Sequence, residues 1–260
     1  MNISLPASKN KRPSDRSSAG RPSGISCRAR PLFSLGSRLS SCASMVRVGT
    51  ALADVGTDHA YLPVWLAKEG LIRSAVATDI RPGPLARARA NIARFGVSNL
   101  VSARLSDGLD RIEPCEAEDI VIAGMGGLMM VHILERAPWL KETGRRLILQ
   151  PMTKAEELRG FLVREGFFVM QEQAAEENGH VYSVMQVSYC PQEQQEEDLF
   201  YYIGRMTAET AQGRNYLEIQ KRRLEKRANG LSISGNAQDA DHFYSLVTEI
   251  EKLLSYGPVE

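Results

Sequence analysis

The amino-acid sequence predicts an α/β fold with a largely parallel sheet, followed by a separate helical region. From residue 52 to residue 190, short apolar stretches of strand length alternate with stretches of helical periodicity. The first strand leads into a turn containing Asp and Gly, as is common in doubly wound domains. After Pro191 there is no strand-like stretch, and amphipathic spacing continues to Leu254. This order favours a sheet covered by helices on both faces.

The predicted elements of the α/β part follow one another closely. We expect helices at 35–48, 62–68, 84–95, 128–135 and 153–164, and strands at 52–55, 74–80, 100–105, 119–123 and 146–150. Pro63 is tolerated near a helix start, and Gly96 is a helix stop. Two further strands, 167–174 and 180–190, flank Asn178-Gly179, a dipeptide that favours a tight hairpin turn. We therefore expect the parallel sheet to end in an antiparallel hairpin.

The region after residue 191 is predicted to be a helical hairpin. Residues 192–198 form an acidic, Gln-rich connector. Amphipathic helices are expected at 216–227 and 241–254, around a turn at Gly235-Asn236. The second helix carries an apolar stripe made of Phe243, Leu246, Val247, Ile250, Leu253 and Leu254. The domains are thus expected at 34–191 and 192–260.

The first 33 residues are rich in Ser, Arg, Pro and Gly, and the first fifty hold nine Lys or Arg but a single acid, Asp15. Such a composition cannot build a core and predicts disorder. A transit peptide, a nonspecific RNA-binding arm and a start codon assigned too far upstream would each explain it. We favour the last, because helical spacing of Leu39, Cys42, Ala43 and Val46 marks a natural beginning.

Composition excludes several classes of protein. The 260 residues carry a net charge of +1, so no global field attracts a polyanion. The four Cys and four His residues are scattered, which predicts no metal site and fits a reduced cytoplasm. The longest apolar run, 120–134, is short and interrupted by Gly, so no membrane span is expected. We expect a cytoplasmic monomer.

The turn after the first strand, residues 53–63, points to a cofactor. Its Asp-x-Gly-x-Asp-x-Ala spacing matches the acidic-x-Gly-x-Gly-x-Gly turn of enzymes that use S-adenosyl-L-methionine, with Asp58 and Ala60 in the second and third Gly places. Asp58 would repel the pyrophosphate of a dinucleotide. The ammonium and sulfonium of S-adenosyl-L-methionine would instead be attracted. A plain helix cap and turn is the alternative.

Two later strand ends carry matching acids. Asp79 ends the second strand, where an acid typically binds both ribose hydroxyls; a helix cap is the alternative. Asp107-Gly108 follows the third strand, where a carboxylate can accept from the adenine amine and Gly lets the ring approach; a plain turn is the alternative. The predicted cofactor residues are Asp54, Gly56, Thr57, Asp58, His59, Asp79, Ile80, Asp107, Gly108, Ala123, Gly124 and Met125.

The segment 123–127, Ala-Gly-Met-Gly-Gly, follows the fourth strand. The Asn/Asp-Pro-Pro-aromatic motif of enzymes that methylate exocyclic amines is absent there, as is a Pro-Cys nucleophile. A Gly-rich floor with free N–H groups suits a ring nitrogen that needs no activation. The alternative is a tight turn for close packing. Candidate substrate contacts are Gly126 and Gly127, Arg38, and the basic run Lys221, Arg222, Arg223, Lys226 and Arg227, for which solvated surface is the alternative.

Several motifs together resemble bacterial tRNA (adenine-N1)-methyltransferases. They are Ala-Asp-Val-Gly-Thr-Asp-His-Ala-Tyr-Leu-Pro at 53–63, Asp79-Ile80 with Gly83-Pro84-Leu85, Asp107-Gly108-Leu109, Ile-Ala-Gly-Met-Gly-Gly at 122–127 and Leu-Ile-Leu-Gln-Pro at 147–151. The resemblance begins near residue 35, is strongest between 51 and 165 and is weak in the tail. It implies a Rossmann-like class I methyltransferase domain, a C-terminal helical (coiled-coil) domain, S-adenosyl-L-methionine as cofactor and a structured tRNA substrate.

The implied reaction makes modest chemical demands. Adenine N1 has an in-plane lone pair, so the enzyme must mainly orient the base and exclude water. The base has to be turned out of the tRNA fold, and the product ring is cationic. Asp58 is the candidate carboxylate near that ring, and Tyr61 the candidate stacking surface. A small-molecule methyltransferase and a catalytically silent RNA-binding protein on the same fold are the alternatives.

Overall fold

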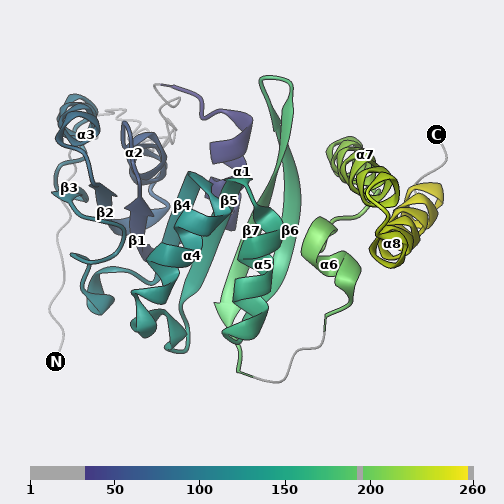
Figure 1. Cartoon of the computed structure of the whole chain (residues 1–260). Coiled ribbons are helices and arrows are strands. Elements are labelled where there is room, and N and C mark those ends of the chain that lie inside the picture. Colours follow the sequence, from purple (N-terminus) through teal and green to yellow (C-terminus); the bar gives the residue numbers. More distant parts are fainter. Residues whose placement is uncertain (1–32, 192–195, 257–260) are drawn as a thin grey trace, which may run out of the picture. The chain divides into compact units, whose positions relative to one another are not determined.

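The computed structural model describes residues 33–191 and 196–256. Its centre is a seven-stranded sheet with the strand order β3-β2-β1-β4-β5-β7-β6 (Figure 1). The strands are β1 Thr50–Val55, β2 Ile72–Asp79, β3 Val101–Leu105, β4 Asp119–Gly126, β5 Arg146–Thr153, β6 Phe167–Glu177 and β7 His180–Tyr189. The first five are parallel, and β7 runs antiparallel between β5 and β6. The predicted α/β sheet with a terminal hairpin is confirmed.

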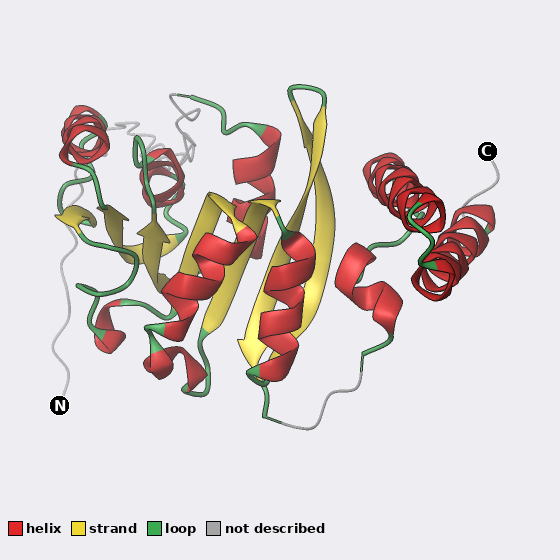
Figure 2. Cartoon of the chain, viewed as in Figure 1, coloured by secondary structure: helices red, strands yellow, loops and turns green. Residues whose placement is uncertain are grey.

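Helices cover both faces of the sheet (Figure 2). They are α1 Ser37–Met45, α2 Tyr61–Lys68, α3 Pro82–Arg94, α4 Gly127–Glu135 and α5 Ala155–Arg164, with short 3-10 helices at Pro114–Glu116 and Pro138–Lys141. Because strand side chains alternate, Leu52 packs with α1, α2 and α3, whereas Ala53 packs with α4 and α5. Both faces of the central strands are therefore apolar, as buried parallel strands require.

The hairpin turn has the geometry that its sequence predicts. Asn178 and Gly179 both have positive φ angles, 53° and 75°, which is the requirement of a two-residue type I′ turn. Glu177 pairs with His180 across it. The first strand of the hairpin runs to Glu177, three residues beyond the predicted end, because pairing with β7 continues to the turn.

The C-terminal region contains α6 Asp198–Ile203, α7 Ala211–Ile233 and α8 Ala237–Ser255. The long helices α7 and α8 pack against each other and form a third apolar cluster with α6. Thr210 caps α7 by accepting a hydrogen bond from the Gly213 N–H at 3.0 Å. The predicted stripe on α8 is buried except at its end, where Leu254 is partly buried and Leu253 is 38% exposed. Helix α6 was not expected from the sequence.

A buried polar cluster joins α7 to the sheet. Arg159 of α5 contacts Glu172 of β6, with 2.5 Å between Nη2 and Oε1, and donates to the Tyr216 hydroxyl of α7 at 3.0 Å. Its Nη1 also donates to the carbonyl of Tyr201 at 2.9 Å. Arg159 thereby links α5, β6, α6 and α7.

Phe33 belongs to the folded part of the chain. Its ring lies 5.4 Å from that of Tyr61 and 5.0 Å from that of Phe95, centroid to centroid. The predicted extension 1–33 thus ends in a packed residue, and residues 1–32 lie outside the described part.

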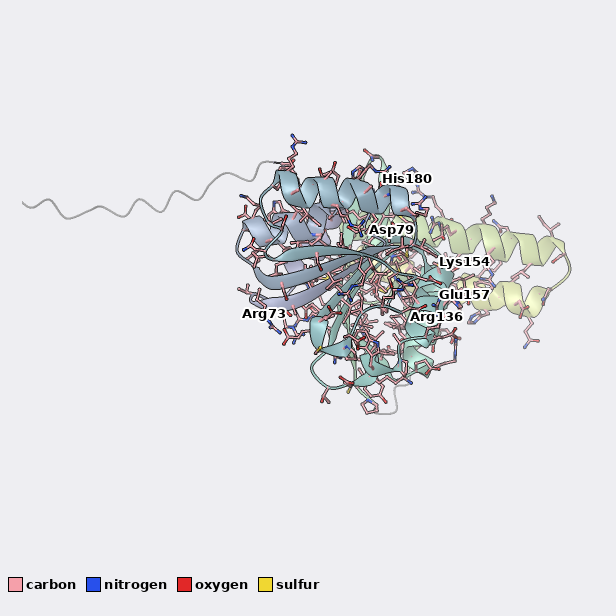
Figure 3. All side chains as sticks on the ribbon, turned by 90° about the vertical axis from the view of Figure 1, so that its left-hand side faces the viewer. Arg73, Asp79, Arg136, Lys154, Glu157 and His180 are labelled. Atoms are coloured by element: carbon pink, nitrogen blue, oxygen red, sulfur yellow. The ribbon has the colours of Figure 1, made fainter. Side chains whose placement is uncertain are left out.

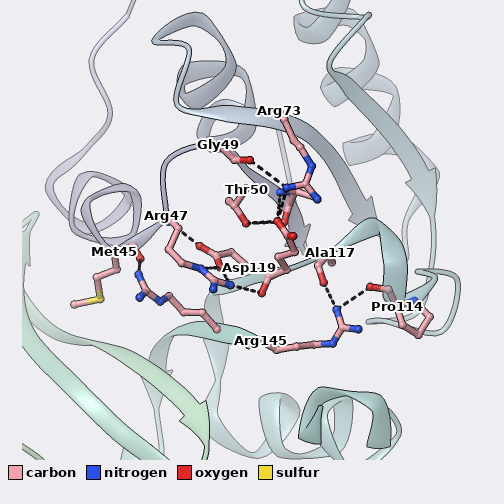
Figure 4. Close-up of polar contacts among 12 residues, drawn as sticks. Met45, Arg47, Gly49, Thr50, Arg73, Pro114, Ala117, Asp119 and Arg145 are labelled. Atoms are coloured by element: carbon pink, nitrogen blue, oxygen red, sulfur yellow. Dashed lines mark hydrogen bonds and ion pairs between the residues drawn. The ribbon is translucent and has the colours of Figure 1, made fainter. Parts of the chain in front are cut away.

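The two edges of the parallel sheet differ in chemistry. Arg73 and Asp79 mark the two ends of β2 in Figure 3. At the amino-terminal edge, the buried Asp119 carboxylate accepts from the backbone N–H and the Nε of Arg47, both at 2.7 Å (Figure 4). Glu118 pairs there with Arg73 at 2.6 Å. These partners hold α1, β1, β2 and β4 in register and leave the opposite edge for a site.

Candidate active site

A cavity of about 410 Å³ lies at the carboxyl edge of β1, β2 and β4. This is where ligands bind in open α/β sheets. Its lining comprises Arg38, Leu39, Asp54, Gly56, Thr57, Asp58, His59, Ala60, Tyr61, Leu62, Asp79, Arg81, Ala123 and Gly124. The structure therefore brings the turn after β1, the end of β2 and the segment after β4 together around one space.

Asp54 is the most perturbed acid of the cavity. Its side chain is buried at the end of β1, and burial raises its pKa to about 6, opposed by a hydrogen bond from Thr57. Thr57 Oγ1 also accepts from the Ala60 N–H at 3.0 Å, which fixes the turn before α2. Burial thus disfavours the ionised form of Asp54, and a cationic group bound in the cavity would stabilise that form.

Steric constraints explain why glycine occupies two positions in the cavity wall. Gly56 has a φ of +78°, and a Cβ on it would lie 2.0 Å from Cε of Met125. Gly124 has a φ of +80°, and a Cβ there would lie 3.3 Å from Nη1 of Arg38. Both positions favour glycine for conformation, and both allow close approach to neighbouring groups. Met125 itself does not line the cavity; it packs over Gly56.

Asp79 has features of both a ribose-binding acid and a helix cap, the two roles predicted for it. Its Oδ1 accepts from the backbone N–H of Arg81 at 2.7 Å, next to the start of α3. Its side chain is only 6% exposed, yet it lines the cavity. The carboxylate has two oxygens, so holding the chain at Arg81 leaves acceptor capacity on Oδ2. The neighbouring Ile80 is 60% exposed and outside the cavity lining.

Asp58, His59 and Tyr61 form one side of the cavity. Asp58 lies 2.5 Å from Arg87 Nη2 and 3.4 Å from His59 Nε2. The hydrogen bond from Arg87 lowers the pKa of Asp58. The rings of His59 and Tyr61 are stacked, 5.0 Å between centroids at 17°. Asp58 therefore stays ionised, and one face of Tyr61 is already covered.

Arg38, a predicted tRNA contact with solvated surface as the alternative, is held by two polar side chains of the protein. Its Nη1 donates to Oε1 of Gln150 at 2.7 Å, and its Nε donates to Glu177 at 3.2 Å. The same Gln150 oxygen accepts from the Gly124 N–H at 3.0 Å. Gln150 is completely buried within β5. Arg38 thus faces the cavity. Its partners Gln150 and Glu177 were not predicted from the sequence. A Gln inside an apolar strand was the one signal that could have indicated Gln150.

Asp107 and Gly108 lie outside the cavity. Asp107 pairs with Arg136 of α4 at 2.9 Å. Gly108 has a φ of +56°, and a Cβ on it would lie 2.9 Å from the side chain of Ile133. The two residues are at the neighbouring strand end of β3, where Leu105 and Ile80 expose apolar surface beside them. Neither residue lines the cavity, so the cavity does not test their predicted contact with adenine.

Gly126 and Gly127 differ in their surroundings. A Cβ on Gly127 would lie 2.2 Å from the backbone oxygen of Lys154, and Gly127 is buried. This residue lets the start of α4 pack against the start of α5, as the packing alternative predicts. Gly126 is half-buried, and its Cβ would lie 3.2 Å from Thr153 Oγ1.

The basic run of α7 is not uniform. Lys221 pairs with Glu251 of α8 at 3.5 Å and with Glu218 at 3.8 Å. Arg227 lies over the Phe243 ring, 4.3 Å from its centroid. Arg222, Arg223 and Lys226 are exposed. None of the five lines the cavity of Asp54 and Asp79.

Known proteins match both the sequence and the fold. A family model described as a methyltransferase domain matches residues 35–185. The tRNA (adenine(22)-N(1))-methyltransferase of Bacillus subtilis (strain 168) is 40% identical over 152 residues, 58% of this chain and 63% of that relative, just under two thirds of its length. The crystal structure of the B. subtilis m1A22 tRNA methyltransferase TrmK has a TM-score of 0.74 at 27% identity, covering 84% of this chain and 98% of that chain.

The chain belongs to the tRNA (adenine(22)-N(1))-methyltransferase family. A Streptococcus pneumoniae protein in complex with S-adenosyl-L-methionine has a TM-score of 0.71 at 30% identity, covering 84% of this chain and 99% of that chain. The motifs at 53–63 and 122–127 that carried the resemblance lie on the cavity or border it in this member of the methyltransferase family.

Two further observations concern this methyltransferase family member. No helix in the described part of the chain is long and apolar enough to cross a membrane. Among residues 33–191 and 196–256, no group of three or more His, Cys, Asp or Glu side chains could hold a metal ion.

Proposed function

We propose that this protein transfers a methyl group from S-adenosyl-L-methionine to N1 of an adenine in the D-arm region of tRNA. One observation carries the proposal: two buried carboxylates, Asp54 and Asp79, end adjacent strands and line one cavity. The family relationship supplies the substrate, since the B. subtilis relative is named for adenine 22 of tRNA.

The residues of the cavity fit the cofactor. Asp54 is placed for the ammonium of the methionine part, because a cation offsets the cost of ionising this buried carboxyl. Arg38 lines the same space and carries the opposite charge, so we assign it to the methionine carboxylate. Asp79 has acceptor capacity for ribose hydroxyls. When bound, the cofactor supplies a methyl group on a positively charged sulfur.

The protein's own task is to orient adenine N1 and to keep water away. Tyr61 lines the cavity and is 42% exposed, so its uncovered face is our candidate surface for stacking the target base. Asp58, held ionised by Arg87, is our candidate carboxylate beside the methylated, cationic ring. We assign the C-terminal helices to the tRNA, whose shape and phosphates they would contact.

The test is to incubate the protein with labelled S-adenosyl-L-methionine and unmodified bacterial tRNAs, then to map 1-methyladenosine. We expect label at a single D-arm adenine. Label on small molecules but on no tRNA would favour a small-molecule methyltransferase. Cofactor binding without transfer to any acceptor would favour a catalytically silent RNA-binding protein. Asp79→Ala is the control that should reduce any transfer by weakening cofactor binding.

A further inference from the structure

A second cavity separates the catalytic sheet from the C-terminal helices. It has a volume of about 360 Å³ and adjoins a space of about 330 Å³ that shares Lys154, Tyr202 and Arg223 with it. Its walls are the end of β5, the start of α5, the start of β7, and α7. We call this continuous feature the domain groove.

The charge of the domain groove is positive. Lys154 and Arg223 line the first space, and Arg227 lines the second. Glu156 is the acid that lines both, 3.8 Å from the Lys154 ammonium. Three cationic side chains thus face one carboxylate, which suits an anionic occupant.

The groove also offers apolar and polar contacts. Met152 is 41% exposed there, and Tyr182 and Tyr202 are half-buried in its walls. Ser183 lines the same space; its hydroxyl is buried and has no hydrogen-bond partner in the described part of the chain. A base can stack on tyrosine rings, and a ribose hydroxyl can pair with an unsatisfied serine.

The last residues of β4 lie between the groove and the cofactor cavity. Gly124 lines the cofactor cavity, and Gly126 pairs in register with Thr153, which lines the groove. The Cα atoms of Gly124 and Gly126 can be at most about 7 Å apart. An RNA strand that places one base at the cofactor therefore passes the groove within one or two nucleotides.

We propose that the domain groove binds a single-stranded RNA segment that flanks the methylated adenine. Its phosphates contact Lys154, Arg223 and Arg227, and one base lies against Met152 and the tyrosines. The volume is that of a small-ligand site, which suits a nucleotide. The proposal rests on the proposed function for the identity of the RNA.

The helix α7 supplies a matched comparison for the test. Arg223 and Arg227 are four residues apart and share one face of the helix with Tyr216 and Gln220. Tyr216 and Gln220 also line the groove. Arg222 and Lys226 are rotated from them by about 100° around the helix and do not line the groove. Arg223→Gln with Arg227→Gln and Arg222→Gln with Lys226→Gln therefore remove equal charge from neighbouring faces.

The experiment measures binding of unmodified tRNA to both double variants as a function of salt. We expect the groove variant to flatten the slope of log K against log salt by about 1.4, since each phosphate contact on a single strand contributes roughly 0.7. Its KM for tRNA should rise at least tenfold with S-adenosyl-L-methionine affinity unchanged. The comparison variant should change the slope by less than half as much, and Lys154→Gln should flatten it by about 0.7.

If the two double variants changed the salt slope of tRNA binding equally, the proposal that the groove binds RNA would be wrong, even if the wild type methylates tRNA. Binding of a ten-nucleotide single-stranded RNA separates the two proposals. If the groove variant loses that RNA while the wild type transfers no methyl group to tRNA, the proposed function fails and the groove stands. The melting temperature of each variant shows whether it is still folded. This control matters most for Arg227, which contacts Phe243.

Discussion

Arg159 and Glu172 form an ion pair in which neither side chain is exposed to solvent. Both participate in contacts to other elements: Arg159 donates to Tyr216 of α7, and Glu172 Oε2 accepts from the Arg205 N–H at 3.0 Å. The pair therefore joins the catalytic sheet to the helical domain. A buried pair of this kind is costly to break, because one charge is left without its partner.

Glu172→Gln should reduce the free energy of unfolding by about 3–5 kcal/mol, because it leaves the Arg159 guanidinium buried and unpaired. Tyr216→Phe removes only one neutral partner and should cost about 1 kcal/mol. Thermal melts of both variants check this. A Glu172→Gln protein as stable as the wild type would mean that water reaches Arg159 and solvates it.

Asp54 should make stability depend on pH in a defined direction. Its folded-state pKa of about 6 is above the ordinary value of 3.8, so its contribution is fully present below pH 3.8 and is lost as the pH rises through about 6. Asp54→Asn should therefore gain stability relative to the wild type between pH 4 and pH 8, by about 1–3 kcal/mol. Melting curves at both pH values measure the difference; a constant difference would contradict it.

Cofactor affinity should show the opposite trend. Below about pH 6 the Asp54 carboxyl is protonated and no longer attracts an ammonium. We expect S-adenosyl-L-methionine affinity of the wild type to fall as the pH drops through this range. Calorimetry from pH 5 to pH 8 tests it, with Asp54→Asn as a variant whose weak binding should not change with pH.

Asp79 can be separated into its two roles by a pair of substitutions. Asp79→Asn keeps an Oδ1 that accepts from the Arg81 N–H but removes the charge. We expect it to weaken cofactor binding by about 1.5–3 kcal/mol with little effect on melting temperature. Asp79→Ala should weaken both. If Asp79→Asn binds the cofactor normally, the residue holds only the chain before α3.

The packing role of Gly127 predicts a contrast with its neighbour. Gly127→Ala places a Cβ 2.2 Å from a backbone oxygen of Lys154, which cannot move aside as a side chain can. The cost should be about 1–3 kcal/mol. Gly126→Ala meets a Thr153 hydroxyl at 3.2 Å and should be tolerated. Similar melting temperatures for the two variants would contradict the packing role.

Phe33 refines the expected start of the folded chain. A protein beginning at Pro31 should keep the melting temperature of the full chain, because the Phe33 contacts to Tyr61 and Phe95 remain. One beginning at Leu35 loses about 1–2 kcal/mol of burial and aromatic contact. Its melting temperature should fall by about 2–8 °C. Equal melting temperatures would show that the ring contributes nothing to stability.

Local sequence patterns predicted the sheet, its order of strands and helices, and the hairpin turn. The continuous apolar run of β1 and the Asn178-Gly179 turn both act over a few residues, so one sequence is enough to recognise them. The turn after β1 was found for the same reason. Helix α6 was missed because six residues, Asp198–Ile203, are too few to show a period, and its stability comes from packing against α5.

Contacts between distant segments could not be read from local patterns. Arg38 was predicted to contact the tRNA, with solvated surface as the alternative. Its burial depends on Gln150 and Glu177, which are 112 and 139 residues away. Likewise, the five basic residues of α7 looked equivalent in sequence, and only the position of α8 and the sheet distinguishes Arg223 from Lys221.

The bond between Arg38 and Glu177 sets an order for synthesis of the protein. Helix α1 is among the first structured segments to leave the ribosome, yet its partner in the hairpin is made 139 residues later. Folding proceeds from the N-terminus during synthesis, and contacts of such long sequence separation form late. The nascent chain therefore cannot complete the cavity until the hairpin has emerged. Early fragments should fail to retain cofactor even when β1 and its turn are already present.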